Sequence, residues 1–332
     1  MPNAIRQSAK GFTVGTMGLG LRSGAQGDVK HDVHDGDTVI TRALDNFGVR
    51  FLGIDAAEES FPLPGKKLPF TKISDPKWEQ ALADPFTPAW DTPLEPALQQ
   101  DIAARLHGGG AAANHAELAD KALEALTQEV SADQQTLGKS DADFRFFLAF
   151  AYDIVDRYGR LLCYLHPDLP KDAPKQLSYN ERLLEAAQVI PYFIWPNVDP
   201  FVHFAFGKTG SIQDAIPKPD EVDKLVQKSP KLKRAREWVA AARQAGKGVY
   251  SHTDKLRLLP FELRFISRKR PPDRWVLDLS SDAGVLLAPQ SYFKVPHLED
   301  RLFVPPEFVA LFERVGWTME AGAAVPGSAL AV

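Results

Sequence analysis

The segment HDGDTVITRALDNFGVRFLGIDAAEES, residues 34–60, carries the pattern on which the fold depends. Apolar and polar residues alternate across residues 28–56, and turn-forming residues interrupt the alternation at Asp35-Gly36, Asp45-Asn46 and Gly48. This pattern predicts consecutive strands joined by tight turns. The turns and strand ends carry charges of both signs, from Asp35, Asp37, Arg50, Asp55, Glu58 and Glu59. A solvated hairpin needs no charges at fixed spacing, whereas a site for a metal and a phosphate needs most of them.

The composition limits the possible classes of protein. The 332 residues suffice for one large domain or two ordinary ones, and 44% hydrophobic with 25% charged residues is a globular composition. No apolar run is long enough to span a membrane. The single cysteine, Cys163, excludes an internal disulfide and a cysteine-based zinc site. A net charge of −4 is unusual for a protein that grips nucleic acid, although a local basic patch is compatible with it.

The rest of the chain predicts an α+β organisation. Residues 1–26 are interpreted as a strand region rather than an export signal, which favours a cytoplasmic location and leaves secretion as the alternative. Residues 60–110 contain eight prolines and are expected to be an irregular insertion, as are the loop-like residues 199–229. Helices are predicted at 115–130, 178–189, 231–245 and 307–315, two strands within 144–165, and further strands at 261–266, 275–279 and 292–295. The expected domains are residues 1–252 and a C-terminal extension, 253–332.

The charged residues of these segments suit metal and acid–base chemistry. Asp37 and Asp55 carry carboxylates, which a hard cation such as Ca²⁺ prefers. Glu58, three residues after Asp55, can take a proton from a water molecule. Arg50 and Arg160 carry guanidinium groups, which hold phosphate oxygens in pairs. Each residue alone also has an ordinary explanation, as a turn residue, a cap or a surface ion-pair partner.

Three motifs stand in order along the chain: DGDT at 35–38, VRFLGIDAAE at 49–58 and DRYGRLLCYL at 156–165. Taken together, they resemble the signature segments of the staphylococcal nuclease family. Two predicted helices, in SYNERLLEAAQVIPY and KLKRAREWVAAARQAGKGVY, are similar to the helices that follow these motifs in the family. The resemblance spans about residues 28–250 and leaves the C-terminal extension unexplained. Three motifs in a fixed order are a fairly specific signal, whereas any one of them alone is weak.

The resemblance implies an α+β fold with an OB-type five-stranded β-barrel and packed helices, to which residues 253–332 add a small α/β extension. It also implies calcium-dependent hydrolysis of DNA or RNA, leaving 5′-hydroxyl and 3′-phosphate ends. The calcium ligands it implies are the carboxylates of Asp37 and Asp55 and the carbonyl of Ala56. It implies that Glu58 activates water, that phosphate is held by Arg50 and Arg160, and that substrate also contacts Arg157, Tyr158 and Tyr192. The chain departs from the family at Ala57, which replaces a proline, so the turn before Glu58 lacks a fixed φ.

A non-catalytic role on the same fold is the alternative. OB-type barrels bind single strands through aromatic rings and basic grooves without any chemistry. The acidic net charge and the long insertion favour an altered role, whereas the complete set of acids and arginines favours catalysis. The basic run Arg268-Lys269-Arg270 is explained by a solvated surface or by contact with a phosphate backbone. The expected partner is DNA or RNA and not a membrane, and the C-terminal extension is a candidate site for a protein partner.

Overall fold

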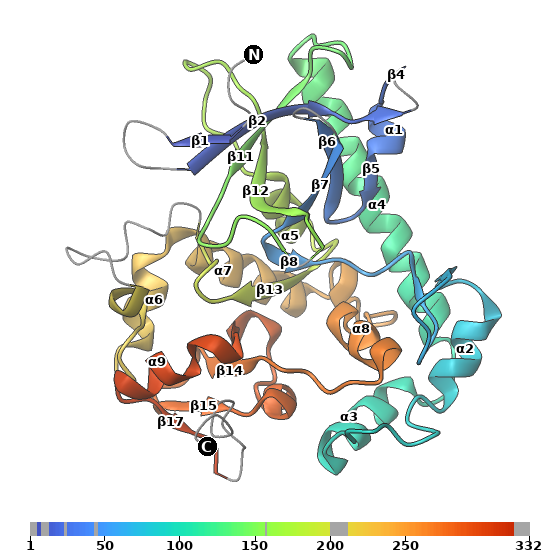
Figure 1. The fold of residues 1–332 in the computed structure, drawn as a ribbon, viewed down its shortest axis with the longest axis vertical. Helices are drawn as coiled ribbons and strands as arrows, with labels where there is room; N and C mark the ends of the chain where they lie inside the picture. The colour runs from blue at the N-terminus through green and yellow to red at the C-terminus, as the bar shows by residue number, and fades with distance from the viewer. Residues whose placement is uncertain are drawn as a thin grey trace, which may run out of the picture.

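The computed structural model describes residues 5–7, 13–22, 25–42, 46–156, 158–199 and 212–321 (Figure 1). Both strands and helices occur along these ranges. A β-barrel lies at one end of the molecule, and a second sheet with its helices lies at the other. None of the helices in these ranges combines the length and the apolar character that crossing a membrane requires.

Five strands close the barrel: β2 (Thr13–Leu19), β6 (Thr38–Arg42), β7 (Asn46–Phe51), β11 (Arg145–Ala149) and β12 (Leu161–Pro167). β2 pairs with β6 and β11, β7 pairs with β6 and β12, and β11 pairs with β12, which completes the ring. Of these five pairings within the barrel, only that of β7 with β12 is parallel. This order is consistent with an OB-type barrel, so the predicted α+β fold with a five-stranded barrel is confirmed. The sheet is extended by β1 (Ile5–Gln7) and β5 (Val33–Asp35).

The barrel packs closely against α4 (Ala111–Thr136), the longest helix of the described residues. Alternate residues of the opening segment, such as Val39 and Val49, are fully buried inside the barrel. At the turn between β5 and β6, a Cβ atom on Gly36 would lie 2.5 Å from the Cβ of Ala122 in α4. Only glycine therefore allows this turn to approach the helix so closely.

The three central helices predicted from the sequence are present, with different lengths. α4 begins before and ends after the predicted range 115–130. α5 (Tyr179–Glu185) is shorter than predicted, and the side chains of Ser178 and Glu181 cap its first turn. α7 (Pro230–Ala245) ends at Gly246, whose φ of 61° lies in the left-handed region that favours glycine.

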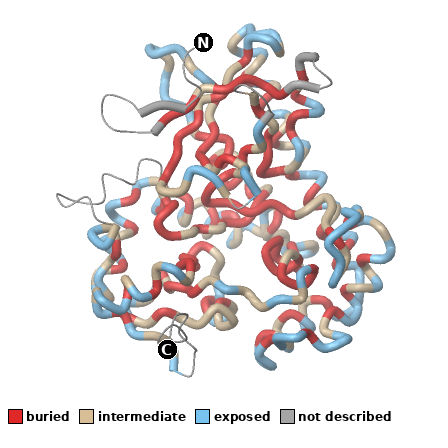
Figure 2. Tube along the Cα trace, viewed as in Figure 1, coloured by how far each residue is buried: buried red, intermediate tan, exposed pale blue. Residues whose placement is uncertain are grey.

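A second sheet includes strands from both sides of the predicted domain boundary at residues 252 and 253. Its strands, in spatial order, are β17 (Thr318–Met319), β15 (Val285–Leu287), β14 (Trp275–Asp278), β16 (Arg301–Val304), β13 (Ile190–Ile194) and β8 (Gly53–Asp55). β13 pairs in parallel with β16 and antiparallel with β8. Figure 2 shows buried residues, in red, in the barrel and in the middle of this sheet, where all of β16 is buried, whereas the edge strand β17 has no buried residue.

Residues 60–110 are more regular than predicted. They form β9 (Ser60–Pro62), β10 (Phe70–Lys72), α2 (Pro76–Ala83) and α3 (Pro96–Leu106). Pro76 and Pro96 stand at the first position of their helices, where the missing N–H leaves no hydrogen bond unmade. The prediction of an irregular segment was therefore wrong, because prolines at the first position of a helix are compatible with regular structure.

Several further local predictions need correction. Residues 261–266 lie in a helix, α8 (Pro260–Arg268), and not in a strand. Residues 292–295, also predicted as a strand, fall mostly in the 3₁₀ helix η4 (Pro289–Lys294). The remaining elements are β3 (Leu21–Arg22), β4 (Ala25–Gln26), α1 (Val29–Asp32), η2 (Ile212–Ala215), α6 (Val222–Lys228), η3 (Gly248–Tyr250), η5 (Leu298–Asp300), η6 (Pro306–Phe308) and α9 (Val309–Arg314). Of these, α1 interrupts the predicted run of strands, and α6 and η2 replace part of the predicted loop.

Candidate functional site

The predicted acids meet at one end of the barrel because the chain changes sheets between Arg50 and Asp55. Residues five apart in one continuous strand point to opposite faces. Here β7 belongs to the barrel and β8 to the second sheet, and Gly53 begins β8 with a φ of 78°. Asp37 reaches the same place because it directly precedes β6, the neighbour of β7.

Arg50 bridges the two buried aspartates. Its Nη1 donates to Oδ1 of Asp37 and its Nη2 to Oδ1 of Asp55, both at 2.6 Å. The two aspartates are 1% and 0% exposed, so hydrogen-bond donors of the protein must replace water around their charges. The backbone N–H of Ala56 supplies a further donor, to Oδ2 of Asp37 at 3.0 Å. Four residues of the predicted site are therefore in direct contact.

Arg264, which was not predicted to belong to the site, completes this arrangement from α8. Its Nη1 donates to Oδ1 of Asp55 at 2.8 Å and to Oε1 of Glu58 at 2.7 Å. Its Nη2 donates to Oδ2 of Asp55 at 2.9 Å. Asp55 is thus bonded by two guanidinium groups. The set Asp37, Arg50, Asp55, Glu58 and Arg264 is termed the charged cluster below.

Two carboxyl groups at this place have raised pKa values. Burial raises the pKa of Glu58, although the Arg264 and Arg50 guanidinium groups oppose the rise. Burial raises the pKa of Asp35 well above its usual value, and the charge of Asp37 is the second cause of this rise. A carboxylate with a raised pKa accepts a proton more readily, so this environment suits Glu58 to act as a base.

His115, a second residue that the sequence reasoning missed, fixes the main chain at Glu58. Its buried ring lies on α4, where Nε2 accepts a hydrogen bond from the Glu58 N–H at 2.9 Å. Nδ1 donates to the carbonyl of Leu258 at 3.1 Å. One ring nitrogen accepts while the other donates, which only a neutral imidazole can do. Consistently, burial lowers the pKa of His115 to about 4.

The substitution His115→Gln is expected to flatten the pH dependence of stability. The pKa is about 4 in the folded protein and 6.5 in the unfolded chain, so the unfolded chain binds more protons between these values. The free energy of unfolding should therefore fall as the pH is lowered through this window, by about 3 kcal/mol in total. Urea unfolding at several pH values measures the slope. The exposed-site variant His107→Gln should keep the wild-type slope; an equal slope for His115→Gln would contradict the assignment.

Arg160 lies beside the charged cluster but outside it. Its Nε donates to Oδ2 of Asp156 at 2.8 Å, and its guanidinium lies 5.6 Å from the centre of the Tyr158 ring. Its side chain packs along β7, where a Cβ on Gly48 would come within 3.1 Å of it. Gly48 and Arg50 point to the same side of β7, so the two arginines are neighbours on the barrel surface.

The two tyrosines predicted to contact substrate differ in accessibility. Tyr158 is 62% exposed, and its hydroxyl accepts a hydrogen bond from Arg268 at 3.2 Å. Tyr192 stacks on Phe261 with a centroid distance of 5.3 Å, and its hydroxyl accepts a hydrogen bond from Arg274 at 2.6 Å. The ring of Tyr192 is therefore engaged in packing, whereas that of Tyr158 contacts Arg160 and remains largely exposed to solvent.

The charged cluster contains carboxylates of the kind that bind a cation, but arginine side chains already bond them. Its three carboxylates face two guanidinium groups, and carboxylate oxygens are the donors that calcium prefers. Arg50, however, bridges Asp37 and Asp55, and Arg264 covers Asp55. Within the described ranges, no group of three or more His, Cys, Asp or Glu side chains is arranged to hold a metal ion. A calcium ion held by Asp37 and Asp55 would therefore have to displace these arginine contacts.

The two missed residues differ in how far the sequence could have revealed them. No local signal marks Arg264, because its partners lie 209 and 206 positions earlier in the chain. His115 falls on the same stripe of its helix as Leu118 and Ala122, so its burial was predictable from helical spacing. The remaining predicted residue, Arg157, lies outside the described residues.

The sequence matches no model of a known protein family and no curated protein. The resemblance to the staphylococcal nuclease family therefore rests on the three motifs, and the function has to be argued from the charged cluster and its surroundings.

Proposed function

We propose that this chain is a nuclease that hydrolyses phosphodiester bonds of DNA or RNA at the charged cluster. The main support is the convergence of Asp37, Arg50, Asp55 and Glu58 at one end of an OB-type barrel. These residues come from the first two nuclease-like motifs, and the third motif supplies Arg160 beside them. A protein that only binds nucleic acid has no need for three acids at this position.

In the proposed reaction, Glu58 takes a proton from the attacking water molecule. Oε1 of Glu58 accepts a hydrogen bond from Arg264, and no residue in the described ranges hydrogen-bonds Oε2. Oε2 is therefore the atom that takes the proton from the water molecule. The water oxygen forms a bond to phosphorus while the bond to the 5′ oxygen breaks. The 5′ oxygen takes up a proton from solvent water and Glu58 returns its proton to the solvent, which leaves 5′-hydroxyl and 3′-phosphate ends. Arg50 and Arg160 donate hydrogen bonds to phosphate oxygens and stabilise the charge that develops there.

Calcium belongs to this proposal as the cofactor, through the carboxylates of Asp37 and Asp55 and the carbonyl of Ala56. A bound divalent cation would supply charge stabilisation at the phosphate. Because two guanidinium groups already bond Asp55, the cation must compete with Arg264 for this carboxylate. Weak calcium affinity is the direct consequence of that competition.

Labelled single-stranded DNA and RNA should be cleaved in the presence of calcium and remain intact in excess chelator. Denaturing gels resolve the products, and a phosphatase changes their mobility if they carry 3′-phosphate ends. Cleavage that persists in chelator would contradict the calcium requirement. An intact substrate under both conditions would contradict the hydrolysis itself.

The contacts of Arg264 favour a second candidate, a non-catalytic module that binds nucleic acid or a protein. Arg264 bonds both Asp55 and Glu58, and Arg160 is paired with Asp156, so the charged groups are partly neutralised within the protein. A module of this kind should bind labelled strands with or without chelator and leave them uncut. The same experiment therefore separates the two candidates.

A further inference from the structure

Two segments that are far apart in the sequence form one basic and aromatic surface next to the charged cluster. One comprises residues 61–72 of the hairpin of β9 and β10, including its connecting loop. The other is the C-terminal end of α8 with the residues that follow it, 268–270. The exposed ring of Tyr158 lies at their border. These parts together are termed the hairpin surface below.

Hydrogen bonds and ring contacts hold the two segments together. The N–H of Gly65 donates to the carbonyl of Ser267 at 2.8 Å, and the hydroxyl of Ser267 donates to the carbonyl of Pro62 at 2.5 Å. The guanidinium of Arg268 lies 5.6 Å from the centre of the Phe61 ring and donates to the Tyr158 hydroxyl. The hairpin surface is therefore a fixed arrangement of both segments.

The hairpin surface is strongly basic in a chain whose net charge is −4. Residues 61–72 and 268–270 contain six cationic side chains and no acidic one: Lys66, Lys67, Lys72, Arg268, Lys269 and Arg270. All but Lys269 are exposed. A local concentration of positive charge of this kind attracts a phosphate backbone, whose affinity for proteins depends mainly on such contacts.

Exposed aromatic and apolar side chains lie among these cations. Phe70 is 58% exposed and Leu68 is 72% exposed, both on the hairpin, and Phe70 meets the edge of Phe61 at a centroid distance of 5.8 Å. Single-stranded nucleic acid is bound by this combination, because bases stack on aromatic rings while cations hold the backbone. A duplex keeps its bases stacked inside and gains little from open rings.

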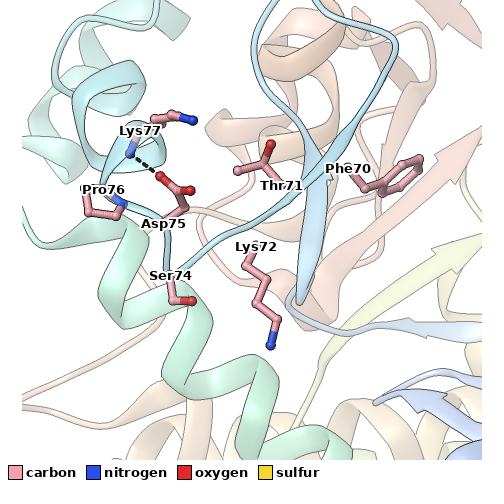
Figure 3. A pocket seen from close by; sticks show the side chains of 7 residues that line it. All are labelled: Phe70, Thr71, Lys72, Ser74, Asp75, Pro76 and Lys77. Carbon is pink, nitrogen blue, oxygen red and sulfur yellow. Dashed lines mark hydrogen bonds between the residues drawn. The ribbon is translucent and has the colours of Figure 1, made fainter.

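A hollow of about 470 Å³ adjoins the hairpin on the side of α2 (Figure 3). Phe70 and Lys72 of β10 and Lys77 of α2 are among the residues that line it. Its one acidic residue, Asp75, accepts a hydrogen bond from the Lys77 N–H as the cap of α2. The hollow therefore extends the basic and aromatic character of the hairpin surface.

The hairpin surface is continuous with the charged cluster. Glu58 precedes β9 by two residues, and Arg264 lies one helical turn before Arg268 on α8. We infer that the hairpin surface binds single-stranded nucleic acid and leads the strand to the charged cluster, with the backbone on the lysines and arginines and bases on Phe70 and Tyr158. This inference rests on the proposed function and names its substrate as a single strand.

The test is binding of a fluorescent oligothymidylate of about 20 nucleotides, measured by anisotropy in excess chelator so that no cleavage occurs. Phe70→Ala is expected to weaken binding about tenfold. The double variant Lys66→Ala/Lys67→Ala should also reduce the slope of log affinity against log salt by about 1.4, since each backbone contact contributes about 0.7. The matched control is Lys139→Ala/Lys171→Ala, which removes two exposed lysines near the other end of β11 and β12 and should bind like the wild type.

The outcomes separate this inference from the proposed hydrolysis. All substituted side chains are exposed, so each variant is expected to fold like the wild type. Equal unfolding temperatures would verify this. Weaker binding confined to the hairpin variants supports the inference, even if the wild type never cleaves. The inference would be overturned if the hairpin variants bind with wild-type affinity or if the control variant loses as much affinity as they do. It would also be overturned if a duplex of the same length binds more strongly or if the wild type does not bind, even if calcium-dependent cleavage is found.

Discussion

Replacing Glu58 with glutamine is expected to lower the rate of phosphodiester hydrolysis by about 10²- to 10⁴-fold. Glutamine keeps the size of the side chain and can still accept a hydrogen bond from Arg264, but it cannot take a proton from water. Because burial raises the pKa of Glu58, the wild-type rate should increase with pH until this carboxyl group is ionised and then level off. The rate is measured on labelled single strands with calcium present.

The neighbouring residue provides the matched control for this substitution. Glu59 has the same chemistry but follows Glu58 outside the charged cluster, so Glu59→Gln should keep the wild-type rate. Equal rates for Glu58→Gln and the wild type would show that this carboxylate is not the base. A loss of rate in both variants would point to a general effect of charge near the hairpin instead.

Replacing Arg50 with methionine is expected to destabilise the protein by about 3–5 kcal/mol. Methionine retains much of the side-chain volume but removes the guanidinium that bridges Asp37 and Asp55, and their carboxylates then stay buried with fewer donors. The free energy of unfolding in urea measures the loss. Arg160→Met is the control, since Arg160 is partly exposed and its pair with Asp156 should contribute less than about 1 kcal/mol.

The destabilisation by Arg50→Met should depend on pH in a defined direction. Arg50 opposes the raised pKa of both Asp35 and Glu58, so its removal raises these pKa values further. A carboxyl group whose pKa is raised by folding costs stability above its pKa in the unfolded chain, and this cost disappears as it becomes protonated. The difference between variant and wild type should therefore shrink as the pH is lowered toward about 4. A difference that is constant from neutral pH to that value would contradict this account of the charged cluster.

The barrel and much of the site were predictable because local signals specify them. Alternating residues across residues 38–51 predict paired strands, and these are β6 and β7, two of the five strands that close the barrel. Asp37, Arg50 and Glu58 were placed by motifs in a fixed order. The sheet change at Gly53 resolves the apparent conflict that Arg50 and Asp55 should face opposite ways.

The helix α8 shows why other parts of the fold and of the site could not be predicted. Residues 261–266 alternate apolar and polar, which is typical of a half-exposed strand. In the structure Glu262 and Arg264 are not solvent-facing: Glu262 pairs with Arg105, and Arg264 pairs with Asp55. Polar residues whose partners lie more than a hundred positions away look like surface residues in the sequence, so both the helix and the fifth member of the charged cluster were missed.

The parallel pairing of β13 with β16 has a consequence for how this protein is made. On the ribosome, the barrel strands and β13 emerge well before residues 301–304. One edge of β13 therefore stays unpaired until β16 has been synthesised. An exposed strand edge pairs readily with other chains. We therefore expect the nascent chain to be most vulnerable to aggregation between the emergence of β13 and that of β16, and a chaperone bound during this interval to improve the yield of folded protein.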